Sequence, residues 1–418
     1  MSAVTATAAL NGIKSSSVWR LLPYLGPAFL VSVGYMDPGN WATDLEGGAR
    51  FGYSLLWVLL AANLMALLLQ HLSAKLGLAT GRTYPRLCRE RFPRPLTLFL
   101  WVTAEAAAMA TDLAEFLGAA LGFYLLLHIP LLPAALLAAL AVFAILALYR
   151  FGFRPVEFVI LGLVFVIGLA YVLEVGLVEP DWPAVANGMF VPRLGGESLL
   201  IAMGMLGATV MPHNLYLHSG IVLTRRSPDP KANHVVVRRA LVDLALALNI
   251  AWLVNSAIVV MAAAAFFTRG LEIDSIELAH ETLTPLLGQL AAMVFGVALL
   301  AAGLASSTTA TLAGQIIIEG FLDIRFGLFL RRAITVVPAL LVIASGLDAY
   351  WILILSQVAL SVQLPFAIVP LVWLTARRDV MGAFANARLT TLLACLVAVL
   401  VIGLNLALLV RLASGEGS

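Results

Sequence analysis

The chain has 418 residues, of which 62% are hydrophobic and only 11% charged, and its mean hydropathy is +1.00. Soluble domains carry roughly 25% charged residues, so this composition excludes a water-soluble globule, and it equally excludes a disordered or collagen-like chain. The net charge of +2 and the lack of a dominant basic face exclude a nucleic-acid-binding protein. An all-α membrane protein with many spans remains, because lipid offers the backbone no hydrogen-bond partners.

Eleven apolar runs, each near the ~20 residues needed to cross a bilayer, follow one another along the chain. Residues 1–17, which precede them, are small and polar and lack the charged start and cleavage site of a secretory signal. We therefore expect a flexible cytoplasmic N-terminus and a first apolar run that is a true span. The runs lie at 21–46, 52–78, 96–127, 131–149, 155–178, 198–223, 240–267, 284–319, 329–346, 348–375 and 389–411.

The distribution of basic residues supports this count and sets the orientation. Cytoplasmic loops are enriched in Lys and Arg. With eleven spans and the N-terminus in the cytoplasm, all but four of the 25 Lys and Arg residues fall on the cytoplasmic side. The pattern predicts a cytoplasmic N-terminus and a C-terminus outside. The four exceptions are Arg50, Arg193, Arg269 and Arg411.

Two spans are interrupted in the same way. The first contains residues 34–40 (GYMDPGN) and the sixth contains residues 208–214 (ATVMPHN), so both read X-Pro-X-Asn around a proline that deletes a helix hydrogen bond. Interruptions in corresponding spans are typical of transporters built from inverted repeats. We expect five-span repeats at 18–180 and 198–375, with an added eleventh helix at 389–411. Two unrelated proline kinks are the alternative, which the matched positions and polar neighbours disfavour.

The side chains at these breaks indicate a cation site. Asp37 is a carboxylate near membrane mid-depth, which is costly and usually functional, and Asn40 could add an amide oxygen. Unwinding frees backbone carbonyls, here those of Gly34 and Ala208, and Met211 adds a thioether. Mg²⁺ and Ca²⁺ require oxygen ligands only, whereas Mn²⁺, Fe²⁺, Co²⁺ and Cd²⁺ accept sulfur. Methionine is more often core filler than ligand, so chemistry alone leaves both roles open for Met211.

These motifs resemble the Nramp family of proton-coupled divalent metal transporters, bacterial members included. The resemblance spans nearly the whole chain: residues 37–40 (DPGN) in the first span, 111–116 (TDLAEF) in the third, and 211–214 (MPHN) with 217–219 (LHS) in the sixth. It implies a LeuT-type fold with helices 1 and 6 broken. It also implies import of Mn²⁺ or Fe²⁺, and of Co²⁺ and Cd²⁺, with protons, across a bacterial inner membrane. No enzyme activity, bound cofactor or nucleic-acid partner is expected, and we expect a monomer.

The resemblance also assigns ligands. Asp37, Asn40 and Met211 would bind the metal through their side chains, and Ala208 through its carbonyl. The methionine favours transition metals, because relatives that carry Mg²⁺ lack it. Gln357 of the tenth span matches a residue that approaches the metal, although an interhelical hydrogen bond would explain it as well.

The third span carries Glu105, Asp112 and Glu115 in an otherwise apolar run. Glu105 and Asp112 are seven residues apart and share one helix face, and Glu115 lies about 60° from Asp112. Acidic groups along one intramembrane face indicate a proton relay. Ion pairing with Arg331 and Arg332, at the inner end of the ninth span, is the alternative, and the two roles can coexist.

The family resemblance adds residues to this route. It implies that the acidic face, together with Asp37, His213, Arg331 and Arg332, carries protons separately from the metal. On the same analogy neither histidine of the sixth span is a metal ligand. We expect His213 to handle protons and His218 to pack at a gate.

Other functions fit the sequence less well. A LeuT-type symporter that uses Na⁺ to carry an organic solute is the nearest alternative, but Asp37 at the break would repel a substrate carboxylate. A metalloprotease would need His-Glu-x-x-His, and His280-Glu281 has no second histidine four residues after the first. No ring of charge typical of a channel is visible.

Overall fold

The computed structural model describes residues 27–229, 233–325 and 327–414. Within these residues, nine helices are long and apolar enough to cross a membrane. The first of the nine, Pro38–Thr80, joins two spans that meet at the turn η3 (Gly52–Leu55), and α14 (Leu328–Ala344) has 17 residues and falls just short of the length required. The eleven predicted spans are therefore confirmed, and the chain is a multi-pass all-α membrane protein. The expected N-terminal segment, residues 1–17, lies outside the described residues.

The helices follow the predicted order, and the two interrupted spans are each built from separate helices. The spans are α1 (Pro27–Val33) with η2 (Gly34–Met36) and α2 (Pro38–Phe51), then α3 (Leu56–Thr80), α5 (Arg94–Leu127), α6 (Leu131–Ala147), α7 (Phe153–Val178), α9 (Ser198–Val210) with α10 (Pro212–Ile221), α11 (Asn233–Ala265), α13 (Gln289–Leu322), α14, α15 (Ala349–Ala376) and α17 (Arg388–Ala413). Shorter elements are α4 (Tyr84–Arg91), η4 (Leu148–Phe151), α8 (Trp182–Phe190), η5 (Val222–Arg225), η6 (Phe267–Arg269), α12 (Ile276–Leu287), α16 (Arg378–Met381) and η7 (Gly382–Phe384).

Two predicted boundaries are decided by turn residues. The expectation that the eighth span begins at 284 was wrong: residues 284–287 belong to α12, and Gly288, with φ of 93°, turns the chain before α13 begins. The division between the ninth and tenth spans is confirmed. Gly346 has φ of 70°, and Asp348 caps α15 by accepting hydrogen bonds from the backbone N–H groups of Tyr350 (2.9 Å) and Trp351 (3.2 Å).

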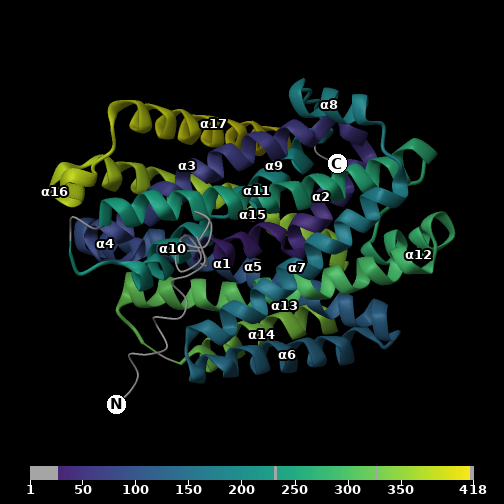
Figure 1. Ribbon diagram of the computed structural model, residues 1–418, viewed down its shortest axis with the longest axis horizontal. Coiled ribbons are helices and arrows are strands. Elements are labelled where there is room, and N and C mark those ends of the chain that lie inside the picture. Colours follow the sequence, from purple (N-terminus) through teal and green to yellow (C-terminus); the bar gives the residue numbers. More distant parts are fainter. Residues whose placement is uncertain (1–26, 230–232, 326, 415–418) are drawn as a thin grey trace, which may run out of the picture.

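The broken helices lie in the middle of the bundle (Figure 1). Helices α1 and α10 contact each other, as do α2 and α9, and α11, α13 and α15 pack around them. Figure 1 also shows α4 and α16 at one end of the molecule and α8 and α12 at the other, while α17 and the pair α6 and α14 lie on opposite sides. The residues at the two interruptions, among them Asp37 and Met211, are fully buried.

Small residues allow α5 and α13 to approach closely. A Cβ atom on Gly303 of α13 would lie 2.6 Å from Cα of Ala119 on α5, and one on Gly122 of α5 would lie 2.6 Å from Cα of Leu300 on α13. In membranes, glycine at such contacts lets two backbones pack directly against each other. This contact fixes the third span, which carries the acidic face, against the eighth.

We therefore predict that Gly303→Val lowers the stability of the folded protein. The added side chain meets backbone, which cannot move aside, so the cost should be about 1–3 kcal/mol. Thermal unfolding in detergent, followed by circular dichroism, measures it. Gly162→Ala is the matched control, because a Cβ at Gly162 of α7 meets no atom of the described residues within 4 Å. Equal unfolding temperatures for the two variants would contradict this packing.

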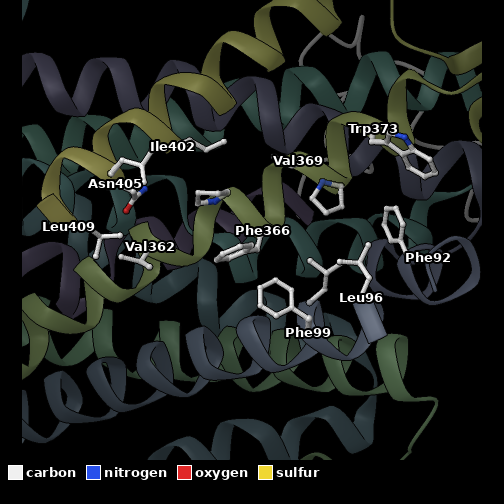
Figure 2. Close-up of a pocket in the computed structure, with 14 residues that line it drawn as sticks. Phe92, Leu96, Phe99, Val362, Phe366, Val369, Trp373, Ile402, Asn405 and Leu409 are labelled. Carbon is white, nitrogen blue, oxygen red and sulfur yellow. The ribbon is translucent and has the colours of Figure 1, made fainter. Parts of the chain in front are cut away.

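A surface groove lies apart from the broken helices. Figure 2 shows it between the start of α5, α15 and α17, with Phe99, Phe366 and Trp373 among its walls and Asn405 at its other end. None of the residues lining it belongs to the predicted site. Its apolar, outward-facing walls are suited to contact with lipid chains.

Candidate functional site

The two helix breaks free the two carbonyls that the sequence predicted. In an α-helix the carbonyl of residue i accepts a hydrogen bond from the N–H of residue i+4. Pro38 is four residues after Gly34, and Pro212 is four residues after Ala208, and proline has no N–H to offer. The Gly34 and Ala208 carbonyls are therefore left available inside the bundle.

These carbonyls converge with a carboxylate on one atom. The side-chain Nδ2 of Asn40 lies 2.5 Å from Asp37 Oδ1, 3.4 Å from the Gly34 oxygen and 3.3 Å from the Ala208 oxygen. The Asp37 and Asn40 side chains are fully buried. Three oxygens from both broken helices thus surround a single amide nitrogen at the buried centre of the bundle.

Asn40 itself is oriented differently from the expectation. Its Oδ1 does not join the three oxygens but accepts a hydrogen bond from Nδ2 of Asn255 on α11, at 3.2 Å. Asn255 also donates to the Tyr35 carbonyl at 2.7 Å. A turn of the Asn40 amide would be needed to present Oδ1 to a cation. Sequence reasoning missed Asn255, although a buried asparagine in the apolar seventh span was a usable signal.

Met211 occupies the break in the sixth span. Its backbone φ of 30° is unusual for a residue with a side chain, and such strain is concentrated at functional sites. Its Sδ accepts a hydrogen bond from Nδ2 of Asn214 at 3.5 Å. The same nitrogen donates to the Val31 carbonyl of α1 at 3.3 Å. The thioether is fully buried, and Asn214, which contacts it, also lies against Gly34 of the first interrupted span.

Gln357 of α15 lies against the start of α2. A Cβ atom on Gly39 would collide with the Gln357 amide, and one on Gly207 of α9 would collide with the Gln357 backbone carbonyl. The Gln357 Nε2 donates to Ser356 at 3.0 Å, and its Oε1 finds no hydrogen-bond partner among the described residues. The structure therefore places Gln357 next to both broken helices with a free acceptor.

The donors at this site are mixed. Within residues 27–229, 233–325 and 327–414, no three His, Cys, Asp or Glu side chains are grouped so that they could hold a metal ion. Asp37 Oδ2 is buried and has no hydrogen-bond partner in the described part of the chain. A lone buried carboxylate oxygen is costly unless a cation or proton joins it. The site suits one ion held by carboxylate, amide, carbonyl and thioether groups.

The acidic face of the third span is paired with the ninth span. Arg331 forms an ion pair with Glu105, and Arg332 lies 3.3 Å from Asp112, which Arg331 also approaches at 4.0 Å. Glu115 is fully buried, and neither of its carboxylate oxygens has a hydrogen-bond partner within the described ranges. The ion pairs considered as an alternative are thus present, and they leave Glu115 uncompensated.

The two histidines of α10 contact different neighbours. His213 Nδ1 lies 3.3 Å from Thr111 Oγ1 on α5, next to the acidic face. His218 Nδ1 lies 3.0 Å from Gln70 Oε1 on α3, and Gln70 donates to the Tyr35 hydroxyl of η2 at 2.8 Å. His213 therefore faces the third span, whereas His218 is tied through Gln70 to the first helix break. Thr111, Gln70 and Tyr35 were not predicted.

Two broken helices that meet at a buried polar site in an eleven-span bundle define a membrane protein with the LeuT-type inverted-repeat fold. Solved transporters share this architecture: MhsT in complex with L-phenylalanine has a TM-score of 0.62 at 14% identity, covering 91% of this chain and 98% of its own. Mhp1, a nucleobase-cation-symport-1 family transporter, has a TM-score of 0.61 at 15% identity, covering 85% and 79%. These similarities show the fold alone.

The chain belongs to the Nramp family. The family model for natural resistance-associated macrophage protein-like chains matches residues 28–411. The divalent metal cation transporter MntH of Deinococcus radiodurans is 49% identical over 98% of this chain and 93% of its own, and that of Bacillus subtilis is 45% identical over 96% and 95%. The solved Eremococcus coleocola manganese transporter has a TM-score of 0.85 at 36% identity, covering 94% and 88%. This is a family of transporters, not of enzymes.

Proposed function

We propose that this chain imports divalent transition metal ions, Mn²⁺ and Fe²⁺ and also Co²⁺ and Cd²⁺, into the cytoplasm together with protons by alternating access. The names of its relatives support divalent metal transport. The observation that carries the proposal is the convergence of Asp37, Gly34 and Ala208 oxygens on Asn40 Nδ2 between the two breaks.

The proposed ligands follow from that convergence. A cation would take the place of the Asn40 amide N–H, and rotation of the amide would present the Asn40 oxygen to the ion. Met211 would add its sulfur, which is buried at the second break. Gln357, whose amide lies against the start of α2 and whose Oε1 has no hydrogen-bond partner among the described residues, would complete the shell. Such a set suits borderline and soft ions better than Mg²⁺ or Ca²⁺.

The alternative is a Na⁺-driven symporter of an organic solute, a class of transporter that can share this fold. The buried carboxylate at the break opposes it. Asp37 would repel a substrate carboxylate, whereas it would attract a divalent cation.

Metal arrival and proton movement are coupled in this proposal through Asp37. A divalent ion beside this carboxylate favours its charged form and displaces a proton. Through His213 and Thr111, which are 3.3 Å apart, the sixth-span break adjoins the third-span face. The proton would then pass along Asp112, Glu115 and Glu105. Arg331 and Arg332 hold two of these carboxylates in place.

We predict that Asp112→Asn separates proton movement from metal binding. The substitution removes a titratable group beside Arg332 but leaves the oxygens around Asn40 untouched, so metal affinity should change less than about twofold while metal-linked proton influx falls about tenfold. Isothermal titration with Mn²⁺ and a pH dye inside proteoliposomes measure the two quantities. Loss of Mn²⁺ binding itself would contradict separate routes.

Topology and gating belong to the same proposal. We propose a monomer in the bacterial inner membrane with its N-terminus in the cytoplasm and its C-terminus outside. Its repeats would span 18–180 and 198–375, with 389–411 added. His218 would act at the inner gate, because opening η2 inward has to break the chain of hydrogen bonds from His218 through Gln70 to Tyr35.

Transport into proteoliposomes tests the function directly. Purified protein should carry Mn²⁺ inward, and the internal pH should fall in step with uptake in the absence of any sodium gradient. Uptake that requires Na⁺, or that leaves the internal pH unchanged, would reject proton coupling. Failure to carry Mn²⁺, Fe²⁺, Co²⁺ or Cd²⁺ at all would reject metal transport.

A further inference from the structure

The sixth-span motif ends in an asparagine that the proposed site does not use. Asn214 is fully buried in α10. Its Nδ2 lies 3.5 Å from Met211 Sδ and donates to the Val31 carbonyl of α1 at 3.3 Å. One amide therefore joins the thioether of the sixth span to the backbone of the first.

The first-span motif contains the corresponding arrangement, in the same sequence order. Asn40 is the third residue of α2, as Asn214 is of α10, and it donates to Asp37 Oδ1 just before the proline. It also donates to the Ala208 carbonyl of α9. In each span the asparagine holds the side chain that precedes the proline and reaches a carbonyl of the other broken helix. The repeated X-Pro-X-Asn pattern thus encodes two reciprocal bridges.

The bridge at Asn214 restricts a flexible side chain. Methionine has three rotatable side-chain bonds, so its sulfur has no fixed direction unless its neighbours hold it. A Cβ atom on Gly34 would lie 3.2 Å from Asn214 Cγ, so the amide occupies the space beside the same glycine whose carbonyl faces Asn40. The N–H contact takes up one lone pair of the sulfur and leaves another for an ion. It therefore restricts the direction of the thioether from the side on which Asn214 contacts the first span.

We propose that Asn214 is a positioning residue for Met211 and thereby sets the preference of the site for soft over hard divalent cations. Its hydrogen bond to Val31 links that preference to the position of α1. This inference rests on the proposed function, in which Met211 binds the ion. Asn214 itself does not touch the ion.

A double-mutant cycle tests this role. Asn214→Leu approximately keeps the side-chain volume and removes the N–H donor, whereas Asn214→Ala removes most of the side chain. Two variants are made so that the test can proceed if only one of them folds. Each is compared with the parent in two backgrounds, native and Met211→Ala, by competition of Cd²⁺ and of Ca²⁺ against Mn²⁺ uptake in proteoliposomes. Loss of one neutral hydrogen bond should lower the Cd²⁺-to-Ca²⁺ affinity ratio about fivefold in the native background. In the Met211→Ala background the ratio should not change further.

The control and the contrary outcomes are distinct. Asn405→Leu removes another buried asparagine, which bridges α17 to the Ser361 carbonyl at 3.0 Å, and should leave the ratio unchanged. A fall in the ratio of the same size in both backgrounds would show that Asn214 does not act through the sulfur, and would overturn the inference. The inference would also be overturned if Met211→Ala lowered the Cd²⁺-to-Ca²⁺ affinity ratio while the Asn214 variants left it unchanged. If Met211→Ala itself has no effect, thioether ligation in the proposed function fails as well.

Discussion

Replacing Asp37 by asparagine should reduce Mn²⁺ uptake by roughly 100-fold or more. Substitutions of residues that only support a metal ligand cost about 10- to 100-fold, and the loss of a charged ligand should cost at least as much. The variant keeps the size of the side chain but removes the only charge among the groups that surround Asn40 Nδ2. Without that charge, only neutral oxygens and a sulfur remain to replace the hydration shell of a divalent ion. Initial rates of Mn²⁺ uptake and Mn²⁺ titration calorimetry measure the effect.

Asp44→Asn is the matched control for this variant. Asp44 is also a fully buried carboxylate, two turns further along α2, and neither of its oxygens has a hydrogen-bond partner among the described residues. We expect this variant to keep at least a tenth of the uptake rate. Equal losses in the two variants would mean that a general need for negative charge in α2, not ligation at the break, explains the result.

Met211→Ala should change selectivity more than activity. Removing the thioether leaves oxygen donors, which hard ions prefer, so Ca²⁺ and Mg²⁺ should become effective competitors of Mn²⁺. We expect the ratio of apparent affinities for Cd²⁺ over Ca²⁺ to fall by about 10- to 100-fold. Competition assays over a range of Ca²⁺ concentrations measure the shift.

A second buried methionine provides the control. Met205 lies in α9, before the break that Met211 occupies, and it is fully buried, but its sulfur lies near Gly47. Met205→Ala creates a similar cavity without removing a proposed ligand, so it should lower stability while the Cd²⁺ preference is retained. If Met211→Ala kept the preference for Cd²⁺ over Ca²⁺, Met211 would be a core-packing residue and not a metal ligand.

Much of the fold could be predicted because the bilayer imposes simple rules. Span length, the distribution of basic residues and the two prolines were enough to count eleven spans and to place both breaks. The predicted start of the eighth span at 284 was wrong because α12 is apolar enough to extend the run, and only the turn at Gly288 separates it from α13. Helix α8 begins where Asp181 caps it, and with nine residues it is too short to be recognised as a span.

The site could be predicted only in part, because side-chain direction depends on contacts from distant spans. The proline spacing identifies Gly34 and Ala208, and charge identifies Asp37. Nothing in the local sequence indicates that Asn40 directs its N–H at these oxygens. That orientation depends on Asn255, 215 residues away, which holds the Asn40 oxygen.

The acidic face illustrates the same limit. Helical periodicity placed Glu105 and Asp112 together, and the ion pairs with Arg331 and Arg332 are present as the alternative anticipated. Periodicity could not show that Glu115 would be left without any such pair within the described residues. Which carboxylate lacks a partner is decided by how α14 packs against α5.

Anomalous diffraction from crystals soaked in Mn²⁺ or Cd²⁺ tests the central claim most directly. The account predicts a single strong peak within bonding distance of both the Asp37 carboxylate and the Met211 sulfur, with the Ala208 carbonyl as a further neighbour. A peak bound elsewhere, for example among Glu105, Asp112 and Glu115, with no density at the two helix breaks, would contradict it.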